Sequence, residues 1–339
     1  MGNSQLQHYL PQVYLKGFAE PGGYVWRYDR LDASCKRLPL RVIGAENDLY
    51  SIQDGGGISQ ALETELFCPI DGSFSPMLRK LENGESLPVD EFEDLAIFVA
   101  YLMVRTPECI RETELRLRQL DTQVGGMNDT VKYYTEDPRP PEAQRSDSFL
   151  LTSEQSAQVS KTRGEGHMRN EVLKALVGGG MQIAHALLDL EWSFLSAPIG
   201  RSFIVGDAPF AIVPPRSHNT DLEGVGPLTP GAATFVPLSS GLCARITNSA
   251  SGIPARRLVD GATVRAVNSC QMMNSERYLF APSEALLGRL TADITAPGLN
   301  LAVVVTREAA SVSSPDSSLI HTFTKSKIPS DWAERLPLD

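Results

Sequence analysis

The sequence predicts an α+β protein in which a helix-rich N-terminal half packs on a β-containing C-terminal half. Apolar residues recur at helical spacing between Phe92 and Met103, which indicates a helix central to the core. After Trp192 the chain changes to short apolar runs separated by turn residues, a pattern typical of strands. Helices followed by strands favour an α+β fold over a doubly wound parallel sheet.

The first predicted element is a short helix from about Pro11 to Phe18. Proline is preorganised for the first turn of a helix, and the run Glu20-Pro21-Gly22-Gly23 ends the segment. Two extended runs follow, Tyr24–Tyr28 and Leu38–Ile43, which are rich in aromatic and β-branched residues. Together they predict a small hairpin.

Helices dominate the rest of the N-terminal half. The pattern is helical from Ser59 to Asn83, and we expect breaks near Pro69 and Pro76, because proline cannot donate a helical hydrogen bond. In the next helix, Asp90 is a candidate N-cap and Glu93 completes a capping-box pattern. Pro107 interrupts that helix, and a charged helix follows.

A polar stretch separates the two halves of the sequence, and predicted helices and strands resume after it. We interpret residues 125–169 as a mobile polar excursion between region 1–124 and region 170–339, the three forming one interlocked domain. A helix is predicted from about Asn170 to Glu191, with a kink or break at Gly178-Gly179-Gly180, since three glycines there cost about 3 kcal/mol relative to alanine. The remaining elements are expected, in order, at Ser202–Gly206, Ala211–Val213, Ala233–Val236 and Leu242–Thr247 (strands), Val264–Gln271 (helix) and Leu299–Val305 (a buried strand).

Composition excludes some classes of protein. The formal net charge of −10 repels phosphate backbones at long range, which disfavours non-specific nucleic-acid binding, although a local basic pocket is compatible with a nuclease. No apolar run approaches the length of about 18 residues needed to span a bilayer, and the first residues lack the features of a secretory signal. We therefore expect a cytoplasmic protein with no membrane partner.

Familiar reactive motifs are missing. The five cysteines are widely spaced without a Cys-x-x-Cys pair, which fits reduced thiols better than disulfides or a zinc site. His167 and His185 have no companion at metal-ligand spacing, so we predict no metal site. Gly55-Gly56-Gly57 lacks the Gly-Lys-Ser/Thr ending of a phosphate loop, and there is no Gly-x-Ser-x-Gly elbow. The cofactor, if any, is not indicated.

Several segments carry a pattern that is similar to a known family. The opening run reads His-Tyr-x-Pro-Gln-x-Tyr-Leu-x-x-Phe from His8 to Phe18. The later segments are Tyr101–Pro107, Trp192 with Phe203–Pro209, Val236–Ser239, and Asn268 with Arg277-Tyr278. In this order they resemble the bacterial family of domains of unknown function numbered 4238, with Gly206 and Ser240 departing from its usual serine and proline. The resemblance implies a shared fold and a shared pocket, and no activity.

Three candidate site residues lie in the opening run. His8 is a candidate general base or acid because the unperturbed pKa of histidine lies near neutrality; alternatively its ring caps the following helix or packs on Tyr14. Gln12 is a candidate substrate-binding amide or a partner for backbone groups of the loop. Tyr14 is a further substrate-binding candidate, although its spacing from Phe18 favours core packing, in which case its hydroxyl needs a hydrogen-bond partner.

Two charged residues complete the candidate site. Arg105 ends an apolar helix, and a buried guanidinium needs either an anionic ligand or a carboxylate partner, for which Asp207 and Glu65 are candidates. Asp207 follows an apolar strand and is a candidate catalytic acid or base, or else a turn-forming residue that binds its own backbone. Glu63 and Glu65 share a short helix, so only one of them can face inward, and solvated carboxylates are the default for both.

Two functions of different classes are compatible with these residues. The first is a hydrolase, phosphodiesterase-like or nuclease-like, acting on an anionic small molecule or a nucleic acid. In it His8 is the base or acid, Asp207 orients it or activates water, and Arg105 holds the anion. The second is a non-catalytic binding or defence-associated interaction protein, in which the motif residues lock the fold. Catalysis requires His8, Arg105 and Asp207 to converge in an accessible concavity. The oligomeric state is not indicated by the sequence.

Overall fold

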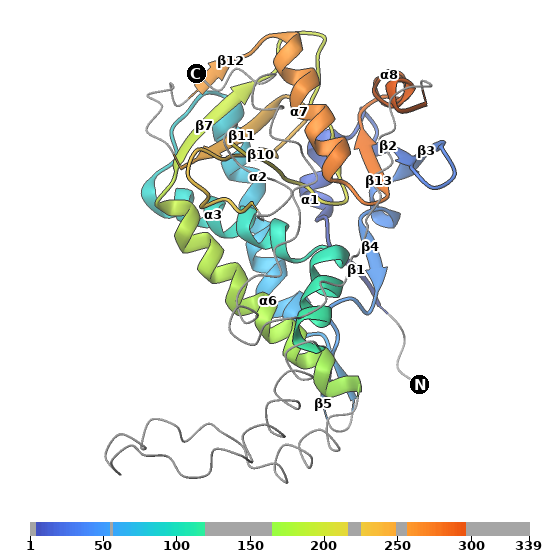
Figure 1. The fold of residues 1–339 in the computed structure, drawn as a ribbon, viewed down its shortest axis with the longest axis vertical. Coiled ribbons are helices and arrows are strands. Elements are labelled where there is room, and N and C mark those ends of the chain that lie inside the picture. Colours follow the sequence, from blue (N-terminus) through green and yellow to red (C-terminus); the bar gives the residue numbers. More distant parts are fainter. Residues whose placement is uncertain (1–4, 55–56, 119–164, 216–224, 249–255, 296–339) are drawn as a thin grey trace, which may run out of the picture.

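The computed structural model describes residues 5–54, 57–118, 165–215, 225–248 and 256–295. Within them, a layer of helices packs beneath a five-stranded sheet, and a four-stranded sheet lies to one side (Figure 1). This arrangement confirms the predicted α+β class. The predicted strand at Leu299–Val305 and nearly all of the predicted polar excursion lie outside the described residues.

The opening run of the sequence forms a strand and a short helix. Strand β1 (Leu6–His8) pairs antiparallel with β4 (Ala45–Asn47), so that His8 lies opposite Ala45. Helix α1 (Gln12–Leu15) continues as the 3-10 turn η1 (Lys16–Phe18), which confirms the predicted helix. Pro11 is its N-cap, a position at which the missing N–H of proline costs the helix no hydrogen bond.

The predicted hairpin is present, but its second strand was placed too late. Strand β2 (Tyr24–Asp29) pairs with β3 (Ser34–Pro39), whereas Leu40–Val42 forms the 3-10 turn η2. Pro39 ends the strand because it offers no N–H for further pairing. The hairpin joins two strands from the second half of the chain, β13 (Tyr278–Ala281) and β8 (Val205–Gly206), in the order β3-β2-β13-β8.

The helical layer is more continuous than its prolines suggested. A π-helical segment, η3 (Leu62–Phe67), leads directly into α2 (Cys68–Glu82). The predicted breaks are wrong: Pro69 falls in the first turn of α2, where no donor is needed, and Pro76 is accommodated inside the helix. Before η3, β5 (Ile52–Asp54) and β6 (Gly57–Ser59) pair as a short hairpin, so the helical region begins later than predicted.

Helix α3 (Val89–Val104) forms the centre of the core, as its periodicity predicted. Its N-cap is Pro88, whereas Asp90 lies inside the first turn and makes no capping hydrogen bond, so the predicted capping box is wrong. An acidic residue in the first turn still interacts favourably with the helix dipole. Residues 107–118 form the next helix, which begins at Pro107.

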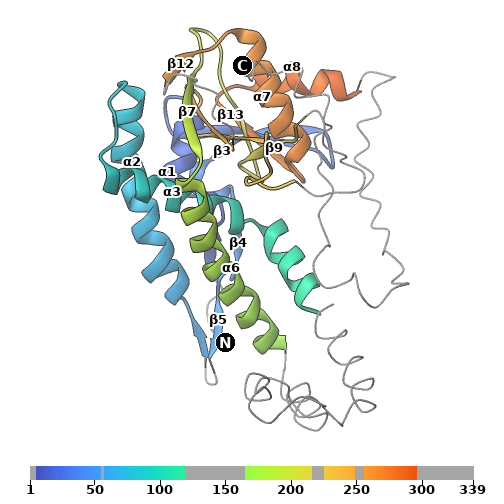
Figure 2. The same ribbon diagram turned by 60° about the vertical axis from the view of Figure 1, so that its left-hand side comes forward.

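Helix α6 (Glu165–Leu188) runs alongside α3 without the predicted break at its three glycines (Figure 2). A Cβ atom on Gly180 would lie 2.6 Å from Cε1 of Tyr101, so the absence of a side chain lets the two helices approach closely. The Tyr101 hydroxyl donates to the carbonyl of Val177 at 3.0 Å. This packing offsets the intrinsic cost of the glycines.

The five-stranded sheet has the order β12-β7-β11-β10-β9. Two strands match their predicted bounds, β9 (Ala211–Val213) and β11 (Leu242–Thr247), and β10 (Ala233–Pro237) extends its prediction by one residue. Strand β7 (Glu191–Ser196) was missed because the predicted helix was carried too far, and only two residues of the predicted 202–206 strand pair, as β8. The remaining elements are β12 (Arg256–Leu258), α7 (Gly261–Asn274) and α8 (Glu284–Thr295).

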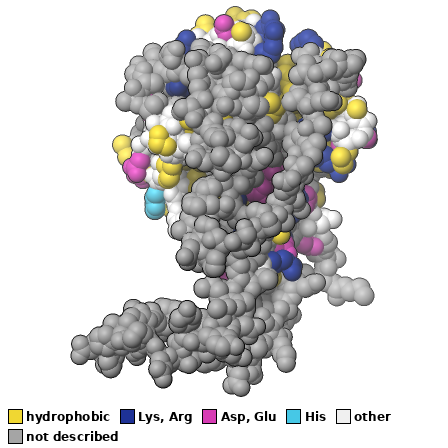
Figure 3. Space-filling view, viewed as in Figure 1, with side chains coloured by type: hydrophobic (Ala, Val, Ile, Leu, Met, Phe, Trp, Pro, Cys, Tyr) yellow, Lys and Arg dark blue, Asp and Glu magenta, His cyan; other side chains and the backbone are white. Residues whose placement is uncertain are grey.

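None of the helices in the described part of the chain combines the length and the apolar character needed to cross a bilayer. On the face in Figure 3, basic, acidic and hydrophobic side chains are interspersed over the described surface.

Candidate functional site

His8 and its neighbour Tyr9 face different groups of charged residues. The charges that act on His8 are those of Asp71 and Arg105. Burial is the largest cause that raises the pKa of Tyr9, and the carboxylates whose charges add to the rise are instead Asp207 and Glu46. His8 is the last residue of β1, and Tyr9 follows the end of the strand. The charges of Asp71 and Arg105 therefore act on His8, whereas the charge of Asp207 acts on Tyr9.

Arg105 is the buried centre of the His8 group. Its side chain is 0% exposed, and its Nη2 donates to Oδ1 of Asp71 at 2.9 Å. The rings of Phe67 and Phe98 lie 5.5 and 5.9 Å from the guanidinium carbon. The expected ion pair thus exists, but with Asp71 and not with Asp207 or Glu65. Within the described residues, Nε and Nη1 have no hydrogen-bond partner although both are buried.

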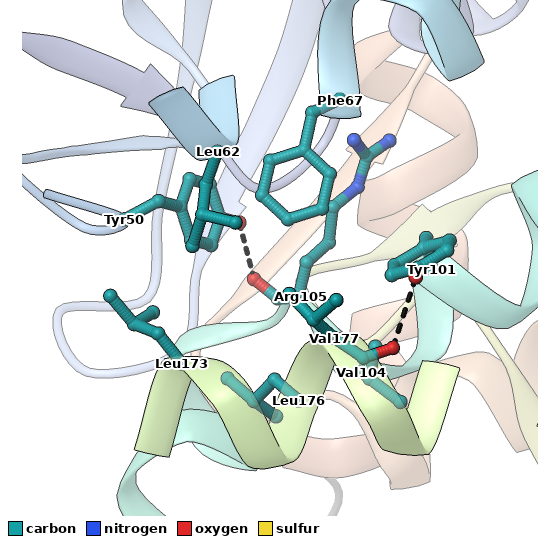
Figure 4. A pocket seen from close by; sticks show the side chains of 9 residues that line it. All are labelled: Tyr50, Leu62, Phe67, Tyr101, Val104, Arg105, Leu173, Leu176 and Val177. Atoms are coloured by element: carbon teal, nitrogen blue, oxygen red, sulfur yellow. Dashed lines mark hydrogen bonds between the residues drawn. The ribbon is translucent and has the colours of Figure 1, made fainter. Parts of the chain in front are cut away.

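The backbone of Arg105 is held where α3 ends. Its N–H donates to the carbonyl of Tyr101 at 3.1 Å, and its own carbonyl accepts from the Tyr50 hydroxyl at 2.5 Å. Figure 4 shows this hydrogen bond, with the guanidinium directed away from Tyr50 and alongside the ring of Phe67. An adjacent cavity of about 10 Å³ is lined by apolar side chains of α3 and α6, among them Val104 and Leu176. That volume accommodates about one water molecule.

The His8 imidazole is half-buried, and its surroundings favour the neutral form. Burial lowers its pKa, while a hydrogen bond to the backbone of Arg41 and the charge of Asp71 act in the opposite direction. Its Nε2 is buried and has no hydrogen-bond partner among the described residues. A neutral imidazole with an unengaged nitrogen can accept a proton.

Two carboxylates that sequence reasoning did not select complete the cluster. Burial is the largest cause that raises the pKa of Asp71, despite the opposing charge and hydrogen bond of Arg105. Burial also raises the pKa of Glu63, against the opposing charge of Arg105. We call His8, Glu63, Asp71 and Arg105 the His8–Arg105 cluster. Perturbed titratable groups gathered from several elements are typical of functional sites.

A sequence signal for Asp71 existed. The positions of Phe67, Asp71, Phe74 and Leu78 are four, three and four residues apart, which places all four on one face of a helix. Phe67, Phe74 and Leu78 are buried in the core. A carboxylate within such an apolar stripe needs a buried cationic partner, and Arg105 ends the neighbouring helix.

Tyr14 and Gln12 lie in different surroundings from His8. The Tyr14 side chain is fully buried, its hydroxyl donates to the carbonyl of Pro237 at 2.6 Å, and its ring contacts the rings of Phe18, Phe74 and Phe98. It therefore ties α1 to strand β10 and to the helical core. Gln12 is exposed at the first position of α1.

Asp207 organises the turn that leads into β13. Its two oxygens accept backbone N–H groups of Glu276, Arg277 and Tyr278 at 2.9, 2.8 and 2.9 Å. Burial raises its pKa, and these three hydrogen bonds oppose that rise. Arg277 in turn donates to both oxygens of Asp29 at the end of β2. This network connects three neighbouring strands of the four-stranded sheet, β2, β13 and β8.

Among the described residues, no three histidine, cysteine or carboxylate side chains are grouped as metal ligands would be. The comparisons with known proteins gave one match. A family model described as "Protein of unknown function (DUF4238)" matches residues 6–285, a span that begins in β1 and ends in α8 and so includes every residue of the His8–Arg105 cluster. No curated protein and no solved structure matches the chain.

Proposed function

The chain belongs to the DUF4238 family of proteins of unknown function, and we propose that this member is a hydrolase of an anionic ester that acts at the His8–Arg105 cluster. The observation that carries the proposal is the state of Arg105. Its guanidinium is fully buried, yet two of its three nitrogens have no partner among the described residues. Leaving buried charged donors unsatisfied costs several kcal/mol, a cost that an anionic group would remove.

The other members of the cluster supply the chemistry of ester hydrolysis. His8 is the proposed base: its unengaged Nε2 takes a proton from the water that attacks the substrate. Asp71 holds Arg105 in place and stabilises the imidazolium that forms, because its carboxylate acts on both groups. Arg105 has no exposed surface and Asp207 binds the turn before β13, so the described residues do not form the accessible concavity of His8, Arg105 and Asp207 expected for a hydrolase. In this proposal Asp71 takes the role that the sequence suggested for Asp207.

The described conformation is closed over Arg105. The guanidinium has no exposed surface and the adjacent cavity of about 10 Å³ is too small for a phosphate. Binding of an anionic group therefore requires the covering side chains to move, and Phe67, at the end of the π-helical segment, is one of them. Phosphate esters suit the proposal best, because a guanidinium presents paired N–H donors to phosphate oxygens.

Turnover of phosphate esters tests the proposal. The purified protein is assayed with 4-nitrophenyl phosphate and with methyl 4-nitrophenyl phosphate, and compared with the His8→Gln variant. A general base contributes about 10²–10⁴-fold to rate, so His8→Gln is expected to lose at least a hundredfold in kcat. His185→Gln, at an exposed position on α6, is the matched control and is expected to keep full activity. Absence of turnover by the unaltered protein, or full activity of His8→Gln, would refute the proposal.

The second candidate is a non-catalytic binding or defence-associated interaction protein, and one observation favours it. The Arg105–Asp71 pair and the Asp207 turn each connect elements that are distant in sequence, as a structural lock requires. In that case His8→Gln and Asp71→Asn would lower stability in parallel with function in cells. A stable but inactive His8→Gln protein would exclude this candidate.

A further inference from the structure

Glu63 is the member of the His8–Arg105 cluster to which no role has been assigned. It lies on η3, one turn before Phe67, whose ring is 5.5 Å from the guanidinium carbon of Arg105. The neighbouring Glu65 is exposed, so of the two carboxylates on this segment Glu63 is the one that faces inward. π-Helical segments are rare and are enriched at functional sites, where the wider turn changes which side chains face inward.

The surroundings of the Glu63 carboxyl group favour its protonated form. Its Oε2 atom is buried without a hydrogen-bond partner among the described residues, and it forms no ion pair with Arg105 in that part of the chain. Burial is the main cause that raises the pKa of Glu63, and the charge of Asp71 acts in the same direction. The pKa of His8 is lowered instead, and the charges of Asp71 and Arg105 act on both groups. Two titratable groups shifted in opposite directions can supply an acid and a base to one reaction.

We propose that Glu63 is the general acid that protonates the leaving-group oxygen in the hydrolysis proposed above, on which this inference rests. Water attacks phosphorus and gives one proton to Nε2 of His8. The bond between phosphorus and the leaving-group oxygen breaks, and that oxygen takes the proton from the Glu63 carboxyl group. The proton on His8 then returns to the Glu63 carboxylate through solvent, which restores both groups.

The test compares two substrates whose leaving groups differ in how much they need protonation as the bond to phosphorus breaks. Methyl phenyl phosphate releases a basic phenolate, whereas methyl 4-nitrophenyl phosphate releases a stable anion. Glu63→Gln keeps the shape of the protonated side chain but cannot donate a carboxyl proton. We expect it to lower kcat/KM for the phenyl ester by at least a hundredfold, the lower limit for general acid catalysis of about 10²-fold, and for the 4-nitrophenyl ester by less than about tenfold.

Controls separate this inference from the proposed function. Glu65→Gln, at the exposed neighbouring position, is expected to leave both rates unchanged, and Glu63→Asp is expected to restore part of the phenyl-ester activity. The high-pH limb of the rate profile is expected to disappear in Glu63→Gln, while the limb due to His8 remains. Equal loss with both esters, or no loss with either, would overturn the role of Glu63 alone. No turnover by the unaltered protein would overturn the proposed function, and the role of Glu63 with it.

Discussion

Replacement of Asp71 by alanine is expected to lower the free energy of unfolding by about 3 kcal/mol, because Arg105 would remain buried without its counter-ion. The Arg105 side chain is 0% exposed and the Asp71 side chain 21% exposed. Removal of one partner from a buried ion pair costs about 3–5 kcal/mol. We expect the lower end of that range, since solvent reaches one edge of Asp71 and two phenyl rings stabilise the guanidinium.

The measurement is urea denaturation at pH 7, followed by circular dichroism. Asp90→Ala is the matched control, because Asp90 is an exposed carboxylate in the first turn of α3 and its interaction with the helix dipole is worth about 0.3–1 kcal/mol. A third protein carries Asp71→Ala together with Arg105→Met. Replacing both partners by apolar residues is often neutral, so the double variant is expected to be more stable than Asp71→Ala alone.

Two results would refute this reasoning. If Asp71→Ala lowers the free energy of unfolding no more than Asp90→Ala does, the Arg105–Asp71 contact contributes no more to stability than an exposed carboxylate. If the double variant is no more stable than Asp71→Ala, the loss does not arise from an uncompensated guanidinium. Either result would also remove the physical basis for Asp71 as the residue that positions Arg105.

Further predictions follow from single contacts. Gly180→Ala is expected to lower the free energy of unfolding by about 1–3 kcal/mol, because the new Cβ would lie 2.6 Å from the Tyr101 ring. Gly178→Ala, where the added Cβ meets nothing, is expected to raise it by about 1 kcal/mol. Thermal denaturation distinguishes the two variants. The pKa of His8 is lowered in the folded state, so its contribution to stability is present above its unperturbed value of 6.5 and is lost as the pH falls through the folded-state value. Relative to His8→Gln, the unaltered protein should therefore lose stability between pH 7 and pH 5 in urea titrations; a pH-independent difference would contradict the assigned burial. Asp207→Ala leaves three backbone N–H groups without their acceptor and is expected to cost about 3 kcal/mol in urea denaturation, whereas a loss below about 1 kcal/mol would show that water replaces the carboxylate.

The periodicity of apolar residues correctly predicted elements that are buried in the core. Strands β9 and β11 and the central helix α3 were found from local sequence, because each has a dense or regular apolar pattern. The helix breaks that were predicted at proline and glycine residues were wrong. Pro76 and Gly180 both lie inside continuous helices, since tertiary packing contributes more than the intrinsic preference of one residue.

For the candidate site, sequence alone selected His8 and Arg105, and the charge of Arg105 acts on the pKa of His8. It did not select Asp71 or Glu63, whose side chains looked like ordinary helical carboxylates. It also grouped Asp207 with His8, although Asp207 binds the backbone of the turn before β13.

The sequence by itself determined the fold class, the family and the residues that need a partner: a guanidinium at the end of an apolar helix and a histidine just ahead of the first helix. Only the tertiary structure decided which partner each one has. Strand β1 alternates its side chains between two sides, and η3 and α2 bring Glu63 and Asp71 to Arg105 over separations of 42 and 34 residues along the chain. Local preferences act over a few residues, whereas such pairings depend on how whole elements pack.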